Sequence, residues 1–428
     1  MAAASEEAIR RIDAVWRIES PKLIGALARV VGDVGAAEEL AQEALVAALE
    51  KWPETGVPDN PGAWLMTTAK NRALDDLRRQ KMLRGKHQEL GRALEEEQES
   101  SGAALEARLE RELDDDVGDD VLRLIFTACH PVLARDARVA LTLRLVGGLT
   151  TAEIARAFLA PEPTIAQRIV RAKKTLAEEK VPFEVPRGRE RGERLASVLE
   201  VIYLIFNEGY AATAGDDWMR PELCEDALRL GRVLAGLAPE EPEVHGLVAL
   251  MEIQASRANA RTSPTGEPIL LLDQDRSRWD QLLIRRGLAA LGRAEELGGA
   301  RGSYALQAAL AACHARARTA EETDWARIVG LYGTLAEVTP SPIVELNRAI
   351  ALAMLFGPEA GLKLVDTLAG DPALASYHLL PSVRGDFLFK LGRFEEARAE
   401  FERAAATAGN ARERTLLMQR AQRARVRE

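Results

Sequence analysis

The residues from 149 to 176 carry the pattern that most narrows the folds open to this chain. Two short amphipathic segments, 149–158 and 163–176, have apolar residues at helical spacing and are joined by a few turn-forming residues. Thr150 and Glu153 have the spacing of a capping box, which predicts that a helix starts there. Two such helices are typical of a helix-turn-helix, whose second helix enters the major groove of DNA.

The second segment divides into an apolar face and a basic face. Ile165, Ile169 and Leu176 are expected to form its buried stripe. On the other face, Arg168 and Arg171 are the strongest candidates for reading bases, because one arginine can bond both O6 and N7 of a guanine. An exposed charge pair is the alternative interpretation of these arginines. The full set expected at DNA, with its lysines on phosphates, is Thr164, Gln167, Arg168, Arg171, Lys173 and Lys174.

The composition favours helices throughout the chain. Hydrophobic residues make up 47% of the 428 residues, aromatic residues only 5%, and long alternating β-branched runs are scarce. We therefore expect an all-α protein, long enough for two to four domains. No apolar run is long enough to predict a membrane span, and the N-terminus lacks the features of a signal peptide.

Three cysteines, Cys129, Cys224 and Cys313, lie far apart and form no CxxC motif. This spacing argues against a disulfide framework or a zinc site and favours reduced cysteines packed as small hydrophobes. We expect a cytoplasmic protein that uses no metal and no cofactor. Nothing in the sequence indicates a convergent catalytic cluster, so we do not expect an enzyme.

The net charge of −9 hides strong local differences. Residues 70–86 hold seven Lys or Arg against two Asp, and residues 164–174 hold four Lys or Arg and no acid. Between them, residues 93–120 hold twelve Asp or Glu against two Arg. A protein that only coats nucleic acid should be basic throughout. Two small basic patches on an acidic body instead indicate selective binding that depends on a partner.

Helical patterns also fill the region before the acidic stretch. Asp33 can cap a helix whose apolar residues continue at helical spacing to Trp52. The turn-rich residues 53–61 form a loop, after which Asn60 and Pro61 are suited to start a second helix. We expect a helical domain at 8–80, an acidic linker at 81–120, the helix-turn-helix domain at 121–180 and a helical extension at 190–428.

Near the end of the chain, residues 385–404 resemble a tetratricopeptide repeat. Small residues would let two helices approach closely, and aromatic residues would fill the gaps between them. Because a single repeat cannot bury its own apolar face, several stacked helix pairs are expected from residue 190 onward. The residues that carry this resemblance are Gly385, Leu388, Gly392, Phe394, Ala397, Phe401 and Ala404.

Taken together, residues 8–178 resemble the extracytoplasmic-function sigma factors. Residues 33–45 resemble the family's polymerase-binding helix, and residues 64–79 resemble its promoter-melting helix. The extension resembles that of a subgroup with tetratricopeptide-like repeats. The turn at 159–163 and Ala166–Gln167 depart from the family pattern, which puts the turn geometry and the preferred bases in question. The resemblance implies two partners, core RNA polymerase and promoter DNA.

The resemblance also assigns roles to residues of the first domain. Asn71 is expected at a base edge or an extruded base, although a surface asparagine making local bonds fits the sequence equally well. Residues 53–61 occupy the family's place for a pocket that holds such a base. The first domain's expected DNA residues are Asn71, Arg72, Asp75, Arg78 and Arg79. The residues expected at polymerase, with a solvated helix face as the alternative, are Asp33, Glu38, Glu39, Leu40, Gln42 and Glu43.

Other functions stay open at this point. One is a helix-turn-helix regulator with a repeat sensor domain that acts without polymerase. Another is a repeat scaffold or an enzyme with an incidental helix-turn-helix. In the charged cluster 272–279 we expect Asp–Arg pairing and packing of Trp279, with a regulatory surface as the second interpretation. We expect the extension to gate activity through contact with the sigma domains.

Overall fold

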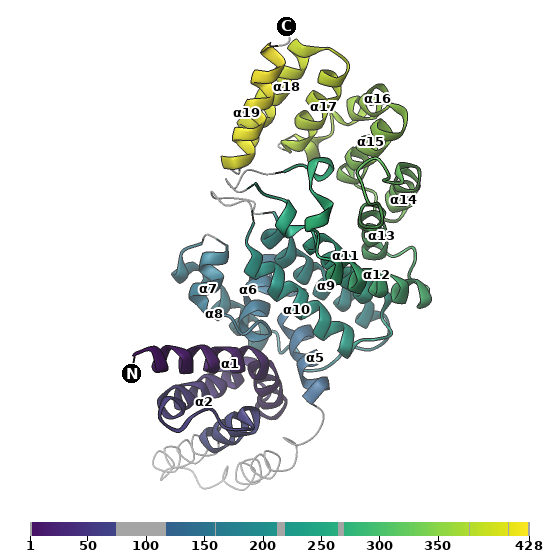
Figure 1. Cartoon of the computed structure of the whole chain (residues 1–428). Coiled ribbons are helices and arrows are strands. Elements are labelled where there is room, and N and C mark those ends of the chain that lie inside the picture. Colours follow the sequence, from purple (N-terminus) through teal and green to yellow (C-terminus); the bar gives the residue numbers. More distant parts are fainter. Residues whose placement is uncertain are drawn as a thin grey trace, which may run out of the picture. The chain divides into compact units, whose positions relative to one another are not determined.

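The computed structural model describes residues 2–73, 117–158, 160–211, 219–263, 269–375, 377–409 and 411–426. Over these residues the chain is helical and has no β-strand, which confirms the all-α prediction. The chain divides into two compact units, Met1–Val201 and Ile202–Glu428. The colours of Figure 1 follow the sequence through both. No helix among the described residues is both long enough and apolar enough to cross a membrane.

Two long helices, α1 and α2, and several shorter ones make up the first unit. α1 packs on both α2 and α5, while α8 packs on α6 and α7 (Figure 1). A further helical stretch covers residues 61–73. The unit's labelled helices are α1 (Ala2–Val31), α2 (Val34–Thr55), α5 (Val117–Ala128), α6 (Arg135–Leu145), α7 (Thr151–Ala157), α8 (Glu162–Glu178) and the first part of α9 (Gly188–Tyr210).

Local side-chain caps fix where these helices start. The Asp33 carboxylate accepts a hydrogen bond of 2.7 Å from the Ala36 amide, and the Asn60 side chain accepts one of 3.1 Å from the Ala63 amide. Thr150 and Glu153 form the complete capping box of α7. All three predicted helix starts are therefore confirmed. α5 begins at Val117, so the last four residues of the expected linker, 117–120, are helical.

The helix-turn-helix has the predicted core. Ile165, Ile169 and Leu176 are each at most 5% exposed, as the apolar stripe of α8 requires. Gly148 has a φ of 71° in the segment between α6 and α7, a conformation that favours glycine. α8 begins at Glu162, one residue earlier than the sequence predicted, because Pro161 supplies the extended backbone that precedes a helix.

The second unit is a succession of helix pairs, each packed on its neighbours (Figure 1). Contacts run mainly between consecutive helices, as expected for stacked repeats. Its helices after α9 are α10 (Pro221–Leu237), α11 (Pro242–Ala255), α12 (Gln281–Glu296), α13 (Ser303–Arg316), α14 (Trp325–Val338), α15 (Pro342–Phe356), α16 (Pro358–Leu368), α17 (Leu379–Lys390), α18 (Phe394–Thr407) and α19 (Ala411–Val426).

The repeat-like pattern at 385–404 forms the predicted helix pair, α17 and α18. A Cβ atom placed on Gly385 would lie only 2.9 Å from the Phe401 ring, so the two helices approach more closely than a larger residue would allow. Phe401 is 2% exposed and belongs to an apolar cluster that extends from α15 to α19. Small residues and aromatic rings thus join these helices as predicted.

The charged cluster 272–279 closes the segment between α11 and α12. Trp279 is 3% exposed, which confirms the predicted packing of its ring. Arg276 donates hydrogen bonds of 2.7 Å to the carbonyl oxygens of His314 and Ala317 at the end of α13. The aspartates flanking this turn act as caps, since Asp275 accepts from the Ser277 amide and Asp280 caps α12. The cluster therefore has a structural role in the fold.

Candidate nucleic-acid interface

Most of the polar face of α8 is open to solvent. Thr164, Gln167, Arg171 and Lys174 are exposed, as the sequence predicted for the outer face of the helix. The Arg168 side chain is 38% exposed, and its Nη2 atom lies 3.3 Å from Oδ2 of Asp136 on α6. The arrangement presents two guanidinium groups from one helix, which suits contact with guanine edges in a major groove.

Lys173 differs from its neighbours on α8. Its side chain is only 19% exposed, and its ammonium group pairs with the Glu38 carboxylate on α2. The side chain also runs past Gly35, where an added Cβ atom would lie 3.9 Å from the Lys173 Cβ. In this arrangement Lys173 contacts protein, contrary to its expected place at a DNA phosphate.

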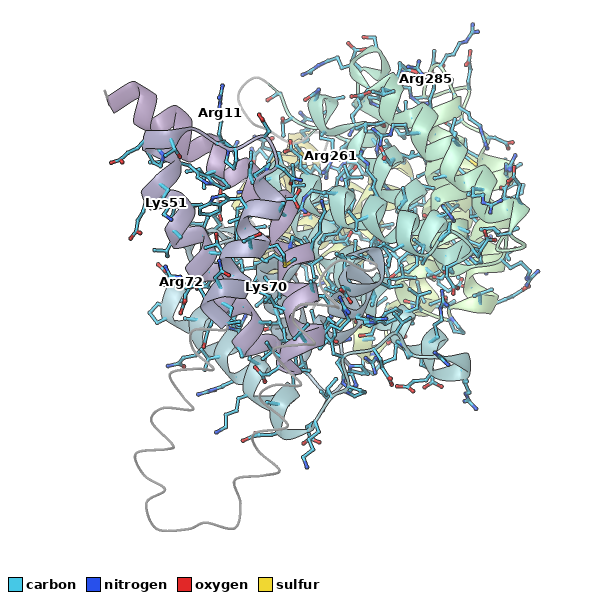
Figure 2. The ribbon with its side chains drawn as sticks, turned by 90° about the horizontal axis from the view of Figure 1, so that it is seen from below. Arg11, Lys51, Lys70, Arg72, Arg261 and Arg285 are labelled. Atoms are coloured by element: carbon cyan, nitrogen blue, oxygen red, sulfur yellow. The ribbon has the colours of Figure 1, made fainter. Side chains whose placement is uncertain are left out.

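The other basic region, residues 70–86, begins at the end of the helical residues 61–73, and its residues from 74 onward lie outside the described part of the chain. Asn71 and Arg72 are exposed, and Nη1 of Arg72 lies 3.6 Å from Oε2 of Glu43 on α2. Figure 2 labels Arg72 beside Lys70 on this helical stretch. Trp64 meets Trp52 edge to face at 5.2 Å, which anchors this helix to α2 and leaves Asn71 and Arg72 pointing outward. The other predicted DNA residues of this region, Asp75, Arg78 and Arg79, lie outside the described residues.

Glu38 requires a correction to the predicted polymerase-binding face. The sequence suggested an exposed carboxylate on a solvated face, but Glu38 is 2% exposed. Its Oε1 atom accepts a hydrogen bond of 2.6 Å from Nε of Arg144 on α6, and Gln42 on the next turn also donates to it. The other oxygen pairs with Lys173. The carboxylate is thus enclosed by cationic side chains from two helices of the helix-turn-helix domain, α6 and α8.

The rest of the predicted polymerase set also divides by exposure. Asp33 is used as the cap of α2, and Leu40 is 9% exposed and belongs to the core. Glu39 is exposed and Gln42 is partly buried. The Glu43 side chain is 44% exposed. Only this subset of the six residues can meet a large partner in the arrangement seen.

Two apolar residues on α2 were missed by the sequence prediction. Val46 is 51% exposed and Leu49 is 42% exposed. They follow Glu39 and Glu43 at helical spacing and lie opposite the buried alanines of the helix, so the same periodicity that located the core could have found them. With Glu39 and Glu43 they make this face of α2 a candidate for contact with a protein partner.

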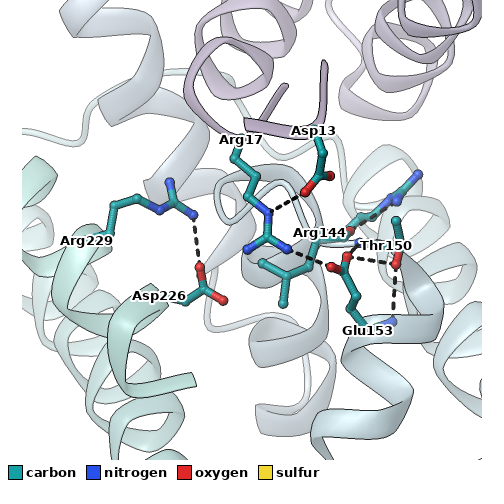
Figure 3. Close-up of polar contacts among 8 residues, drawn as sticks. Asp13, Arg17, Arg144, Thr150, Glu153, Asp226 and Arg229 are labelled. Atoms are coloured by element: carbon teal, nitrogen blue, oxygen red, sulfur yellow. Dashed lines mark hydrogen bonds and ion pairs between the residues drawn. The ribbon is translucent and has the colours of Figure 1, made fainter. Parts of the chain in front are cut away.

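A second charged contact joins α1 to the start of the helix-turn-helix. Nη2 of Arg17 lies 2.6 Å from Oε1 of Glu153, and Nε of Arg17 lies 3.4 Å from Oδ2 of Asp13. Figure 3 shows Arg17 reaching both carboxylates. Burial raises the pKa of Glu153, but hydrogen bonds from the Thr150 amide and hydroxyl, with the charges of Arg17 and Arg156, bring it below its usual value. Glu153 is therefore ionised while it caps α7 and pairs with α1.

The described residues contain no group of three or more His, Cys, Asp or Glu side chains that could hold a metal ion. Burial raises the pKa of the Cys129 thiol to about 12, and that of Cys224 to about 12 as well. Such thiols stay protonated at neutral pH and are poor nucleophiles, in keeping with cysteines that serve as packing groups.

Models of known protein families match three successive parts of the chain. Residues 16–82 match the model of sigma-70 region 2, and residues 123–176 match that of sigma-70 region 4. Residues 194–295 match a family of unknown function, DUF6596. An uncharacterized protein of Rhizobium meliloti (strain 1021) is 43% identical over 394 residues, which cover 92% of this chain and 91% of the relative.

Proposed function

The chain belongs to the extracytoplasmic-function sigma factors with a long helical extension, and we propose that it binds core RNA polymerase and directs it to promoters. The observation that carries this proposal is the presence of both sigma-70 regions in one unit, each with a solvent-exposed helix face. One face suits a protein partner and the other suits DNA.

We assign polymerase binding to the outer face of α2. Glu39, Glu43, Val46, Leu49 and Glu50 lie on one side of the helix and are exposed to different degrees. Apolar side chains surrounded by carboxylates suit a partner surface that is apolar at its centre and basic at its rim. The match to sigma-70 region 2 supports core polymerase as that partner.

We assign promoter recognition to two separate surfaces. Asn71 and Arg72 start the surface for the downstream promoter element, which would continue into Asp75, Arg78 and Arg79 outside the described residues. The outer face of α8 would read the upstream element through Thr164, Gln167, Arg168, Arg171 and Lys174. With a net charge of −9, the protein needs polymerase to supply most of the affinity for DNA.

We further propose that the second unit regulates the sigma domains in cis. The similarity to the Rhizobium meliloti protein runs through both units, so the extension is not an isolated addition to this chain. Stacked helix pairs offer broad surfaces of the kind that bind protein segments. The extension would therefore act as a gate that responds to a signal.

Run-off transcription with core polymerase tests the main proposal. Val46→Asp should abolish polymerase capture, because it places a charge at the centre of the apolar contact. Arg171→Ala should retain polymerase capture but lose promoter choice. Val338→Asp is the matched control, since Val338 is 41% exposed on α14 of the second unit. Normal polymerase binding by Val46→Asp, or promoter binding by the wild type that polymerase does not improve, would contradict the proposal.

The gating proposal needs a truncation that preserves the first unit. Arg194 and Ser197 of α9 donate hydrogen bonds to the carbonyl oxygens of Phe126 and Cys129, so a cut near residue 185 would damage the sigma domains. A chain that ends at residue 211, after α9, retains these contacts. We expect its transcription activity to differ from that of the full chain. Equal activity and equal polymerase affinity would exclude gating by the second unit.

A further inference from the structure

We propose that α2 and α8 hold each other closed in the free protein through one buried carboxylate, that of Glu38, and that polymerase and DNA binding open this contact. We name Glu38, Arg144 and Lys173 the Glu38 latch. The inference rests on the proposed function, because it concerns the regulation of the same two surfaces. Glu38, a predicted polymerase residue, and Lys173, a predicted DNA residue, are each other's partners.

The geometry of the latch accounts for every oxygen of the carboxylate. Arg144 and Gln42 donate to Oε1 of Glu38, and Lys173 pairs with Oε2. The Arg144 and Lys173 side chains are each 19% exposed, while Glu38 is 3% exposed. A carboxylate removed from water to this degree is stable only with such donors, so each charge in the latch depends on the others.

The contact also withholds cations from DNA. Of the four basic residues on α8, Lys173 pairs with Glu38 and Arg168 lies 3.3 Å from Asp136. Because affinity for DNA grows with each phosphate that a cation neutralises, the closed form should bind DNA weakly. Opening the latch would free the Lys173 ammonium group on α8 to meet a DNA phosphate. It would also expose the Glu38 carboxylate on α2 to polymerase.

Other contacts across the same boundary are also charged or closely spaced. Arg17 pairs with Glu153, and Nε of Arg29 lies 3.0 Å from Oδ2 of the buried Asp120. A Cβ atom on Gly25 would lie 2.9 Å from the Asp120 carbonyl oxygen. Ion pairs of this kind have a small net free energy, since desolvation offsets attraction, and a partner that offers equivalent charges can replace them.

Exchange of these pairs would couple the two binding events. Polymerase that draws α2 away would free Lys173 for a phosphate, and DNA that engages α8 would free Glu38 for polymerase. Such coupling is reciprocal by thermodynamic necessity. It explains how a protein with a net charge of −9 can avoid free DNA and still read a promoter once polymerase is bound.

A designed disulfide tests the latch directly. Because Cβ atoms at positions 35 and 173 would lie 3.9 Å apart, the Gly35→Cys and Lys173→Cys pair has the spacing of a disulfide. In the full chain, oxidation should lower run-off transcription by about tenfold or more relative to the reduced form of the same double variant, which is the reference because both forms lack Lys173. Each single variant is a control, since neither should respond to reductant.

A second variant measures the closed form without polymerase. Glu38→Gln leaves Arg144 and Lys173 without their carboxylate, so affinity for promoter DNA should rise by about tenfold. Glu54→Gln removes the same charge from an exposed position on α2 and should leave that affinity within about twofold. Equal effects of the two substitutions would reduce the result to net charge and overturn the latch.

The outcomes separate the latch from the function on which it rests. If the oxidised double variant is as active as the reduced one, the latch is wrong while the sigma-factor assignment stands. If neither the wild type nor the reduced variant captures core polymerase, the proposed function fails. The Glu38→Gln measurement then still decides whether α2 and α8 restrain each other, because it uses DNA alone.

Discussion

Two buried glutamates, Glu38 in the first unit and Glu252 in the second, have the same chemistry in different surroundings. Glu38 is 2% exposed and Glu252 is 1% exposed, and each faces two cationic side chains. Glu252 lies 2.8 Å from Nε of Arg232 and 3.7 Å from Nε of Arg286, so its charge joins α10, α11 and α12.

The difference lies in what else joins the helices. Around Glu252, α11 packs extensively on α12 and α13 through a buried apolar cluster that includes Leu250, Ile253 and Leu291. α8 packs mainly on α6 and α7, and its contact with α2 is small. Apolar burial contributes about 25 cal/mol per Å² whatever partner is present, whereas a charge pair can be exchanged for another. The first arrangement suits a permanent fold, and the second suits a contact that opens.

The largest expected effect tests this contrast with one substitution at each site. Glu252→Ala should lower the free energy of unfolding by ~3 kcal/mol, because it removes a buried side chain from a helix stack that cannot separate and leaves the partly exposed Arg232 and Arg286 without their shared carboxylate. Glu38→Ala should cost about 1 kcal/mol or less, because the boundary can open and hydrate Arg144 and Lys173. Denaturant unfolding of the full chain, with hydrogen exchange to assign each unit, measures both. Equal losses would mean that α2 and α8 are joined as firmly as the stack.

Acid should lower the stability of the second unit through one buried histidine. Burial, helped by the charges of Arg257 and Arg276, lowers the pKa of His314 to about 4 from its usual 6.5. Between pH 6.5 and about 4 the histidine is therefore protonated in the unfolded chain but neutral in the folded chain. The free energy of unfolding falls as the pH drops through this window. The full loss is about 3 kcal/mol for a shift of this size.

A comparison of wild type with His314→Gln isolates the contribution of His314 protonation to the pH dependence of stability. The wild type should lose stability in the second unit as the pH drops through that window, and the substituted protein should lose less. Circular dichroism during denaturant unfolding at several pH values provides the measurement. A difference between the two proteins that stays constant with pH would show that His314 contributes through shape and not through protonation.

Local features of this fold could be read from the sequence, and their success has a physical reason. The caps at Asp33, Asn60 and Thr150 each act within three residues, so the spacing of side chains along the chain is enough to predict them. The buried stripe of α8 follows from helical periodicity for the same reason. Val46 and Leu49 also lay within reach of that argument.

The latch lay beyond such reasoning. Glu38 is one of two adjacent glutamates between alanines and a leucine on α2, and neither residue type nor charge distinguishes it from Glu39. Its burial depends on Arg144 and Lys173, which are more than a hundred residues away in the chain. The role of Arg276 was hidden likewise, because its partners are carbonyl oxygens at the end of α13. Backbone acceptors leave no mark on the pattern of side chains.

The smallest expected effect concerns Glu153, which belongs to both kinds of contact. It accepts a hydrogen bond of 2.7 Å from the Thr150 amide as part of a local cap, and it pairs with Arg17 across the boundary. Because its pKa is lowered from 4.5, its contribution is present above that value and is lost as the pH falls through the folded pKa. Glu153→Gln should therefore cost ~1 kcal/mol at neutral pH and progressively less in acid.

Glu178→Gln is the matched control for this prediction, since Glu178 is 63% exposed and pairs only with Lys174 on the same helix. Its effect should stay below about 0.5 kcal/mol at any pH. Combining Glu153→Gln with Arg17→Met then separates the two contacts of Glu153. If the cap dominates, the two losses add; if the pair across the boundary dominates, the double variant loses little more than either single one. A dominant cap would place Glu153 with the permanent contacts of the helix-turn-helix and leave the Glu38 latch as the main contact that polymerase must open.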